Sequence, residues 1–536
     1  MAQAHAPVLI VGAGGAGLSL ALLLQQHGIA SLLVERRPDV SWHPRARNLN
    51  FRTLEVFRGL GLEAQVIAAG AHFTRTLRKE TVASPEAEEL PSLEQFLHIA
   101  DDLEICTPEP AFWYCPQSRL EPLLRAQARQ RGCDVRYNTE LVCFTQDTQG
   151  VSATIKDRGT GAACVVQANY LLGADGAHSH IRDALGVKTE GLGELDEHYI
   201  FAYFRAPWGD LVRGRDNDAI FIDRPGIQCF FLITDADRGM LVIQEKAARA
   251  YTAERCKALI LDGIGRPDFP VEIVEVAHWQ PDQLVAEQFA SGRVFLVGDA
   301  AHTMPPKLGL GVNTGIQSAQ NLAWKLAAVL KGRAADALLA TYQAERRPVG
   351  LLASQQSLVG PAATLLTKGS DDRLLPAEKR ISYFSLIAGY RYRSQAVLSE
   401  DAAGSAEIEL LSKPQELTGQ PGTRVPHLWL ERGGKRISTL DLLDGRFVLL
   451  TGAGGAAWSE AASVVGAKLG IALSAYMIGP DADLRDPENG WPTRMSVGAS
   501  DAVLVRPDGF VAWRAKVPPA GHAGVLEQAL LSLLCR

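Results

Sequence analysis

Long apolar runs, basic clusters and a leader sequence are all missing from this chain. The longest early apolar run, Leu18–Leu24, is interrupted by Ser19 and falls well short of the ~18 residues that a membrane-spanning helix needs. Lys and Arg total 54 against 60 Asp and Glu, so the net charge of -6 offers no basic surface for nucleic acid or an anionic membrane. The start of the chain lacks the basic residues of a signal peptide. We therefore expect a cytoplasmic protein without nucleic-acid or membrane partners.

Cysteine is also sparse and scattered. The 8 cysteines include no CxxC pair and no Cys/His spacing that suits zinc. This pattern argues against disulfide staples and against a metal site, and it favours buried free thiols.

The chain has, by contrast, ample length and an ordinary globular composition. A chain of 536 residues is too long for one hydrophobic core, so we expect two or three domains. Hydrophobic residues make up 47% and charged residues 21%, as in other soluble proteins.

A dinucleotide fingerprint opens the sequence. Val8–Val11 reads as a buried parallel strand, Leu18–His27 as a helix that Gly28 ends, and Ser31–Val34 as a second strand. The first glycine permits a tight turn, the second lets a pyrophosphate approach, and the third lets helix and strand pack closely. The acid after the second strand would accept hydrogen bonds from a ribose, and the helix N-terminus would bind phosphate. This pattern predicts a dinucleotide site without separating NAD from FAD, and its residues are Gly12, Gly14, Gly15, Ala16, Gly17 and Glu35.

Polar residues beyond the fingerprint are further candidates for ligand contacts. Arg36 and its neighbours read most simply as a solvated basic loop, although either Arg45 or Arg47 could close over a pyrophosphate. Gln117 and Arg119 lie where a strand meets the helix Leu120–Arg131. Ligand contacts at these positions therefore remain hypotheses at this point.

Two later strand-to-turn crossings add acidic and glycine positions. Tyr170–Leu172 leads to Asp175 in a glycine turn, where turn chemistry alone would explain an aspartate. Arg293–Val297 leads to Asp299, whose carboxylate would suit a sugar-alcohol chain. A glycine turn and the helix Ile316–Leu330 follow, and a helix N-terminus stabilises the negative charge of a flat, reduced ring. The turn residues are Pro306, Gly309, Gly311, Val312 and Asn313.

These motifs together resemble those of the FAD-dependent aromatic hydroxylases, the para-hydroxybenzoate and phenol hydroxylase type, in the bacterial branch that acts on phenols and aromatic polyketides. The resemblance covers nearly the whole chain. It rests on the opening fingerprint, on Gly173–Gly176 with Ser179 and Arg182, and on Gly298–His302 with Pro306. It also includes the helices around Asn321–Leu326 and Tyr342–Pro348. The resemblance implies FAD as the cofactor and favours Arg45 and Gln117 as cofactor contacts.

The resemblance further implies an α/β fold of several units. We expect a Rossmann-like FAD-binding domain, an inserted mixed or antiparallel β-sheet that binds substrate, and a thioredoxin-like α/β domain at the end. That last domain lacks the paired thiols of thioredoxin chemistry, so its role is structural or in interaction. The predicted ranges are 1–185 and 281–360 for the FAD-binding domain, 186–280 for the substrate sheet, 361–423 for a helical linker and 424–536 for the thioredoxin-like domain.

Aromatic residues occur at intervals along the predicted strands of the substrate sheet. Most of them would be core, and one or two would stack on a planar substrate. They are Phe201, Tyr203, Phe221, Phe230 and Trp279.

The reaction implied by the family is hydroxylation of an aromatic, phenolic or polyketide-like molecule. NADH or NADPH would reduce the flavin, and O2 would then form a C4a-hydroperoxide that the ring attacks. Candidate bases are His178, His180 and His302, of which His302 is better explained as a structural residue of its motif, and the sequence singles out none of them as catalytic. With no second Rossmann motif, the nicotinamide is expected to visit the FAD domain transiently. The chain could act as a monomer or a homodimer.

Two departures from the family keep alternatives open. Lys307–Leu308 replaces the usual pair of glycines in the flavin turn, and Ser318 stands near a position that is commonly aspartate. The first departure puts easy reduction of the flavin in doubt and is the one feature favouring a non-catalytic binder of an aromatic antibiotic. Baeyer–Villiger oxidation or epoxidation by the same flavin also stays open.

Overall fold

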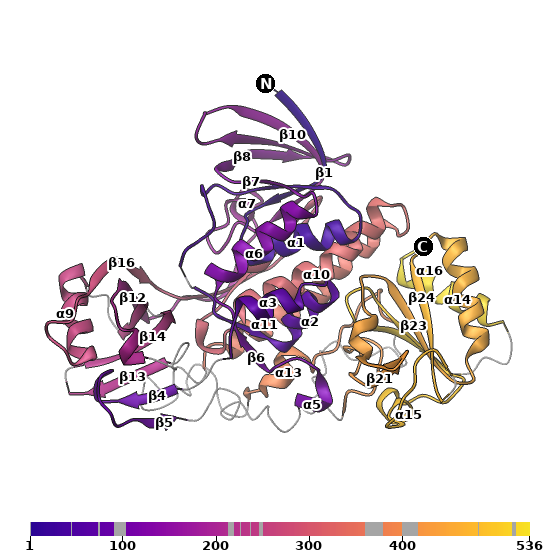
Figure 1. Cartoon of the computed structure of the whole chain (residues 1–536). Coiled ribbons are helices and arrows are strands. Elements are labelled where there is room, and N and C mark those ends of the chain that lie inside the picture. Colours follow the sequence, from indigo (N-terminus) through magenta and orange to yellow (C-terminus); the bar gives the residue numbers. More distant parts are fainter. Residues whose placement is uncertain are drawn as a thin grey trace.

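The structure of the chain is a computed structural model, which describes most of the sequence. The described ranges are 2–43, 45–72, 76–90, 103–212, 219–225, 227–235, 237–245, 250–359, 379–398, 416–480, 482–516 and 521–536. Figure 1 shows one sheet above a central group of helices, a second sheet on the left and a C-terminal unit on the right.

The first sheet is built on two long parallel strands, β1 and β10. They pair from Ala2 opposite Cys164 to Val11 opposite Gly173. Strand β1 therefore extends beyond the predicted Val8–Val11, because β10 is long enough to pair with the earlier residues. The sheet order is β18-β19-β10-β1-β2-β7, and β9 and β8 follow β10 in antiparallel fashion. The strands are β1 (Ala2–Val11), β2 (Ser31–Val34), β7 (Asp134–Arg136), β8 (Thr139–Gln146), β9 (Val151–Asp157), β10 (Ala163–Gly173), β18 (Ala290–Ser291) and β19 (Val294–Leu296).

The helices beside this sheet form the centre of the molecule (Figure 1). Helix α1 packs against both α6 and α10, and α10 packs in turn against α2 and α11. The apolar side chains of α1 are buried almost throughout, since neighbours enclose it on several sides. The helices are α1 (Gly15–Gln26), α2 (Phe51–Gly59), α3 (Glu63–Ala69), α5 (Leu103–Cys106), α6 (Gln117–Gln130), α7 (His180–Ala184), α10 (Gly311–Leu330) and α11 (Ala340–Gln356).

The second sheet has the order β16-β12-β15-β14-β13-β4-β5. The sequence predicts short strands separated by turns at 199–205, 219–223, 228–234 and 240–244, and the middle strands of this sheet agree with those ranges to within two residues. Its edge differs from the predicted ranges: β4 and β5, placed by sequence with the FAD-binding segment, join β13 by parallel pairing of β4. The elements are β4 (Thr76–Lys79), β5 (Glu88–Leu90), β12 (His198–Arg205), β13 (Ala219–Arg224), β14 (Ile227–Asp235), β15 (Arg238–Glu245), β16 (Glu272–Trp279), α8 (Gly209–Val212) and α9 (Ala253–Ile264).

The C-terminal unit is a mixed sheet with helices on it. Strand β23 pairs in parallel with β24 and antiparallel with β25, in the order β24-β23-β25-β26. Helices α14 and α16 pack together, and their core continues to Trp324 of α10. The elements are β21 (Trp429–Arg432), β22 (Lys435–Ser438), β23 (Phe447–Gly452), α14 (Ala456–Leu469), β24 (Leu473–Ile478), α15 (Trp491–Met495), β25 (Ala502–Val505), β26 (Val511–Ala515) and α16 (His522–Leu533).

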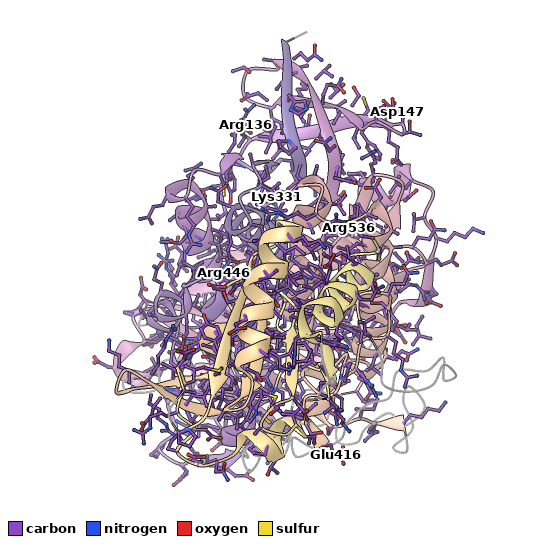
Figure 2. All side chains as sticks on the ribbon, turned by 90° about the vertical axis from the view of Figure 1, so that its right-hand side faces the viewer. Arg136, Asp147, Lys331, Glu416, Arg446 and Arg536 are labelled. Carbon is purple, nitrogen blue, oxygen red and sulfur yellow. The ribbon has the colours of Figure 1, made fainter. Side chains whose placement is uncertain are left out.

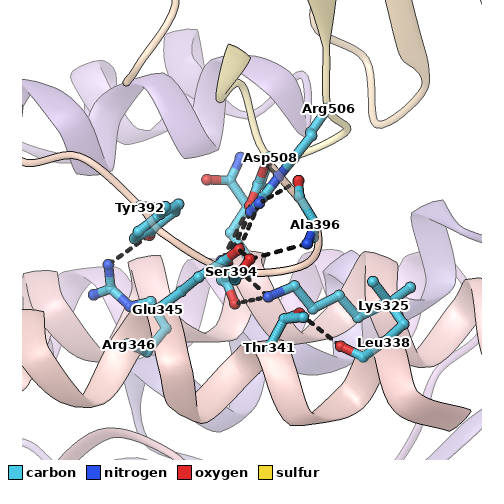
Figure 3. Close-up of polar contacts among 12 residues, drawn as sticks. Lys325, Leu338, Thr341, Glu345, Arg346, Tyr392, Ser394, Ala396, Arg506 and Asp508 are labelled. Atoms are coloured by element: carbon cyan, nitrogen blue, oxygen red, sulfur yellow. Dashed lines mark hydrogen bonds and ion pairs between the residues drawn. The ribbon is translucent and has the colours of Figure 1, made fainter. Parts of the chain in front are cut away.

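A buried charge cluster joins this unit to the central helices (Figure 3). Arg506 donates to Glu345 of α11 over 2.6 and 2.8 Å and to Asp508 over 3.0 Å, and Lys325 of α10 donates to Glu345 over 2.8 Å. The side chains of these four residues are at most 2% exposed. Nearby, Arg424 pairs with the buried Glu55 of α2. Charges therefore lock the C-terminal unit onto α10 and α11.

The predicted linker is described only in part, since 360–378 and 399–415 lie outside the described residues. Between them, helix α13 (Tyr383–Ile387) packs with Phe51, Phe112 and Leu310. The Tyr383 hydroxyl donates to the Leu308 carbonyl over 3.2 Å. This piece of the linker therefore supports the turn that precedes α10.

The remaining strands are short, and all eight cysteines are free thiols. Figure 2 views the molecule from the C-terminal unit, with Arg446 and Arg536 on that unit and Asp147 near the far end of the first sheet. No helix among the described residues is long and apolar enough to cross a membrane. The remaining strands are β3 (Asn48–Asn50), β6 (Phe112–Tyr114), β11 (Thr189–Glu194), β17 (Asp282–Ala286) and β20 (His302–Thr303).

Candidate active site

The glycine turn between β1 and α1 combines close packing with one open position. A Cβ atom at Gly12, whose φ is 104°, would lie 2.2 Å from the Ala174 carbonyl oxygen. A Cβ atom at Gly17 would lie 1.9 Å from the Gly12 carbonyl oxygen. At Gly14 the nearest atom would be Oε1 of Glu121, 3.7 Å away. Gly12 and Gly17 thus allow the strand and the helix to pack closely, and Gly14 leaves backbone surface that a ligand can approach.

Two helix N-termini meet beside this turn. A Cβ atom at Gly15, the first residue of α1, would be 3.1 Å from Cγ2 of Val312 in the first turn of α10. The methyl group of Ala16 would likewise be 3.2 Å from a Cβ atom at Gly298. Neither helix has a side-chain cap at its N-terminus. Their first N–H groups therefore remain available to an anionic ligand.

Glu35 directly follows β2 and contacts the glycine turn. One of its carboxylate oxygens accepts from the Ala13 amide over 2.8 Å, and the other from the Arg37 amide over 2.9 Å. The following residue, Arg36, is exposed, and its carbonyl accepts from Arg158 over 2.8 Å. The structure therefore brings Glu35 to the predicted site and leaves the Arg36 side chain at the surface.

The basic loop and the start of α6 are held together by backbone hydrogen bonds. The Gln117 amide donates to the Ala46 carbonyl over 2.8 Å, and the Gln117 side chain donates to the buried Glu121. Arg45 is exposed, whereas Nη1 of Arg47 is buried and, among the described residues, has no hydrogen-bond partner. A buried guanidinium needs an acceptor. Arg47 therefore fits a bound anionic group at this place.

The aspartate of the second crossing serves its own turn. Asp175 accepts from the Ser179 hydroxyl over 2.6 Å and from the Ile181 amide over 3.2 Å, which caps the short helix α7. Arg182 in that helix donates to the Ala300 carbonyl over 3.3 Å. Arg182 thus joins the turn at Gly173–Gly176 to the turn at Gly298–His302. Both oxygens of the Asp175 carboxylate accept hydrogen bonds from the protein.

Asp299 lies in the short helix η2 (Gly298–Ala300) at the end of β19. Its side chain is open to solvent, yet burial by surrounding protein raises the pKa of its carboxyl, against the nearby positive charge of Arg45. The influence of Arg45 places this carboxylate near the basic loop.

The turn before α10 is shaped by Pro306, which begins the short helix η3 (Pro306–Leu308), and by Gly309, whose φ is 63°. Asn313 holds the turn: its amide nitrogen donates to the Gly309 carbonyl over 2.7 Å and to the Asn48 carbonyl over 2.9 Å. Its amide oxygen accepts from the Asn50 backbone over 3.0 Å. The Asn313 side chain is thus engaged in holding the turn, and the backbone N–H groups of Gly311, Val312 and Asn313 in the first turn of α10 have no acceptor within the helix, whereas Thr314 donates to the Leu310 carbonyl over 2.8 Å.

Lys307 is directed into the protein. Its ammonium group is 3% exposed and donates to Glu197 over 2.5 Å and to the Leu358 carbonyl over 3.1 Å. Glu197 also accepts from the Tyr199 hydroxyl over 3.1 Å. The unusual residue therefore ties the turn to the start of β12 in the second sheet.

The second sheet offers an aromatic face to these loops. Tyr199, Phe201 and Tyr203 alternate along β12, and the rings of Tyr203 and Trp42 lie 5.2 Å apart. Helix α9 packs on the opposite face, around Ile200, Ala202 and Phe204. Three phenylalanines on the aromatic face remain partly open to solvent, whereas the core on the other face is buried. They are Phe201, Phe221 and Phe230.

None of the candidate histidines acquires the surroundings of a base. His302 is 1% exposed, and burial lowers its pKa to about 3, so its ring is neutral and enclosed. His178 lies in the turn before α7 and His180 is the first residue of that helix, and both are exposed. The catalytic base is therefore left unassigned.

Sequence reasoning did not identify Glu121 and Glu197 as site residues. Glu121 stands one helical turn after Gln117, a spacing that places both side chains on one face. Burial raises the pKa of Glu121. Glu197 carries no local signal, because its partner Lys307 is far away along the chain.

The groups left open by the protein match those that a flavin dinucleotide needs. They are the surface at Gly14, the buried Nη1 of Arg47, the carboxylate of Asp299 and the N-termini of α1 and α10. Bound FAD supplies the redox chemistry and the activation of O2 at such a site.

Comparison with known proteins agrees with this geometry. The family model "FAD binding domain" matches residues 5–357, and "Aromatic-ring hydroxylase, C-terminal" matches residues 418–536. The Tetracenomycin A2 monooxygenase-dioxygenase of Streptomyces glaucescens is 39% identical, covering 100% of this chain and 98% of its own. The 4-methyl-5-nitrocatechol 5-monooxygenase of Burkholderia sp is 37% identical, covering 99% and 98%. The crystal structure of aklavinone-11 hydroxylase with FAD and aklavinone has a TM-score of 0.88 at 35% identity and covers 100% of both chains.

These matches span both the flavin-binding part and the C-terminal part, and they confirm the predicted family, fold class and cofactor. The chain belongs to the FAD-dependent aromatic-ring hydroxylases and is a flavoprotein monooxygenase.

Proposed function

We propose that this enzyme hydroxylates a polycyclic, phenolic aromatic of the polyketide type, with O2 and a reduced nicotinamide as cosubstrates. The observation that carries the proposal is the width of the aromatic face on the second sheet. Phe201, Phe221 and Phe230 come from different strands and stay partly open to solvent. A broad apolar wall of this kind suits several fused rings better than one ring.

Two relatives support the substrate class by their names, which refer to tetracenomycin and aklavinone. The nitrocatechol relative shows by its name that a single ring is the alternative. The partly open phenylalanines would lie against the substrate's faces and exclude water from the reacting carbon, which limits wasteful release of H2O2. The substrate's phenol would need a proton acceptor, for which the described residues single out no side chain.

We further propose that the cofactor is held by the residues that converge at the glycine turn. Glu35 would accept from the adenosine ribose, the N-terminus of α1 and Arg45 would face the pyrophosphate, and Asp299 the ribityl chain. Replacement of Asp299 by alanine should then sharply weaken FAD retention. Flavin content after gel filtration measures this, and retention at wild-type occupancy would refute the assignment.

The substrate proposal is tested by oxidation of NADPH and NADH across a panel of phenols, naphthoquinones and polycyclic aromatics. Oxygen uptake and H2O2 are followed in the same sample, and products are identified by mass spectrometry. We expect tight coupling with polycyclic phenols, giving products that carry one added oxygen on a ring carbon. Coupling confined to single-ring phenols would overturn the substrate class. A ring-expanded lactone would indicate Baeyer–Villiger oxidation and an epoxide would indicate epoxidation, each in place of hydroxylation. An aromatic ligand that binds without turnover would indicate a non-catalytic binder.

Location and assembly belong to the same proposal. We propose a cytoplasmic enzyme, where reduced nicotinamides are supplied, acting as a monomer or homodimer. Cell fractionation and sedimentation of the flavin-loaded protein decide both points.

A further inference from the structure

A polar cluster interrupts the aromatic face of the second sheet at the end that meets the flavin turn. Glu197, directly before β12, accepts from the Tyr199 hydroxyl over 3.1 Å and from Nε2 of Gln244 on β15 over 3.4 Å. The same carboxylate accepts from Lys307 in the turn before α10 over 2.5 Å. Side chains from two strands and from the flavin turn therefore converge on one carboxylate.

Gln244 belongs to the aromatic face. It is the register partner of Tyr199, and cross-strand partners point to the same side of a sheet. Phe201 and Phe230 both lie opposite Val242, so each is a diagonal neighbour of Gln244, roughly 7–8 Å away. Both phenylalanines are partly open to solvent. A flat ring that lies on them would have its edge beside the Gln244 amide.

The amide of Gln244 has a fixed orientation and one unmet group. The Glu197 carboxylate, paired with an ammonium group, can only accept hydrogen bonds, so the amide nitrogen must face it and the carbonyl oxygen must point elsewhere. That oxygen, Oε1, is buried and has no hydrogen-bond partner among the described residues. Buried polar atoms in native proteins are rarely left in this state, and an apolar side chain at this place would avoid the cost. The unmet oxygen therefore points to a partner outside the chain.

The missing partner must be a hydrogen-bond donor. A carboxylate, a phosphate or an ionised phenol offers only acceptors, and each would also meet the negative charge of Glu197. The charges of Glu197 and Lys307 balance each other, so the cluster attracts no net charge. A neutral hydroxyl on an aromatic ring satisfies both conditions, because its ring suits the phenylalanines and its O–H suits the carbonyl oxygen.

We propose that Gln244 accepts a hydrogen bond from a ring hydroxyl of the substrate and so selects the orientation in which that ring lies at the flavin turn. Gln244 is then a specificity-determining residue, and Glu197 and Lys307 are positioning residues that fix its amide. The bound hydroxyl keeps its proton, so a substrate that reacts as a phenolate carries a second hydroxyl. This inference rests on the proposed function, because it assumes that the aromatic face binds the substrate, and it narrows the substrate class to polyphenols.

The test is direct binding of 1-naphthol and of 1-methoxynaphthalene to the flavin-loaded enzyme, followed by the change in flavin absorbance. The two probes have the same rings, and the methyl group of the second removes the donor. The variants are Gln244→Met and Gln244→Leu, which delete the amide. Gln167→Met is the matched control, because Gln167 lies on β10 of the first sheet and its amide donates to the Ser152 hydroxyl over 3.1 Å. Flavin content and circular dichroism of each variant verify folding.

We expect wild type to bind 1-naphthol about tenfold more tightly than 1-methoxynaphthalene, because the ether leaves Oε1 unpaired. Each Gln244 variant should bind 1-naphthol about tenfold more weakly than wild type and bind the ether within about twofold of wild type, so that the ratio of the two dissociation constants falls to about one. Gln167→Met should keep the wild-type ratio. A substitution that only loosened the sheet would weaken both probes alike and leave the ratio unchanged.

A wild-type enzyme that does not prefer 1-naphthol to its methyl ether would overturn the assignment, as would Gln244 variants that keep the wild-type ratio. Where one of the two variants fails to retain flavin, the other decides. An enzyme that binds 1-naphthol through Gln244 but turns over no polycyclic phenol would refute the proposed function and uphold the hydroxyl subsite. Coupled hydroxylation of polycyclic phenols by Gln244 variants with a wild-type ratio would do the reverse.

Discussion

Replacement of Arg506 by methionine removes the central cation of the buried cluster between the C-terminal unit and α11. Methionine retains much of the volume of the arginine side chain but carries no charge. Arg506 is 1% exposed, and its guanidinium serves two carboxylates, Glu345 and Asp508, which are 0% and 2% exposed. The change therefore leaves two buried acids to share the remaining partners.

The magnitude follows from those remaining partners. Glu345 keeps Lys325 at 2.8 Å and the Asn321 amide at 2.6 Å, whereas Asp508 keeps only the Asn321 amide at 3.1 Å among its side-chain contacts in the described residues. Asp508 is then a buried charge without a cation. Breaking a buried pair in this way costs about 3–5 kcal/mol of the free energy of unfolding. We expect a loss of that size.

Urea unfolding, followed by tryptophan emission and by release of bound flavin, measures the loss. The matched control is Arg446→Met in the same unit, because Arg446 and its partner Asp444 are 51% and 43% exposed (Figure 2). An exposed pair contributes about 0–1 kcal/mol, so this variant should stay near wild type. Because the cluster also grips α10, flavin should be released at a lower urea concentration in the Arg506 variant.

A second substitution tests the cause. Adding Asp508→Asn to Arg506→Met neutralises the stranded carboxylate and should recover part of the lost stability, about 1–3 kcal/mol. The reasoning is wrong if Arg506→Met unfolds within 1 kcal/mol of the Arg446 control, or if the double variant is less stable than the single one.

Three further predictions concern α10 and its neighbours. Ser318→Asp should raise the free energy of unfolding by about 1–2 kcal/mol, because the fully buried Arg346 donates from Nε to the neutral Ser318 hydroxyl over 3.0 Å and would gain a carboxylate there. Thermal unfolding against Ser318→Asn checks this, and a less stable Asp variant contradicts it. Lys307→Met should lower the free energy of unfolding by about 1–3 kcal/mol, because Lys307 and Glu197 form an ion pair at 2.5 Å. The double variant Lys307→Met with Glu197→Gln should regain most of that loss, and a double-mutant cycle without coupling would count against the pairing. Nearby cations hold the pKa of Glu345 well below its ordinary 4.5, against the effect of burial. The contribution of Glu345 to the free energy of unfolding is therefore fully present above about pH 4.5 and is lost as the pH falls below that value. The stability advantage of wild type over Glu345→Gln should shrink there by up to about 1.4 kcal/mol per pH unit, and an advantage that stays constant down to pH 3 would exclude this role.

Local patterns in the sequence were sufficient for much of the fold. The GxGxxG turn, the strand before it and Glu35 were predictable because each depends on near neighbours: backbone freedom at Gly12, close approach at Gly17 and the reach of an acid at a strand end. The middle strands of the second sheet were predictable because short apolar and aromatic runs are separated by turn residues. The family resemblance rests on these same local motifs, which is why it implied FAD correctly.

Long-range pairings were decided only by the tertiary structure. Strand β4 joins the second sheet, Lys307 meets Glu197, and Arg506 meets Glu345, and in none of these does one partner's local sequence indicate the other. The contacts of single side chains were likewise visible only in the tertiary structure. Asp175 accepts hydrogen bonds from Ser179 and the Ile181 amide, and Asn313 holds the turn before α10.

The lining of one pocket shows the difference most clearly. Arg119, Arg205 and Arg238 line this pocket from a helix and two strands, and although Arg119 was a candidate ligand contact in the sequence, no linear pattern connects the three. Motifs specify chemistry that one turn of the backbone can present. A pocket whose walls come from separate elements exists only once the hydrophobic cores of both sheets have set the distances between those elements.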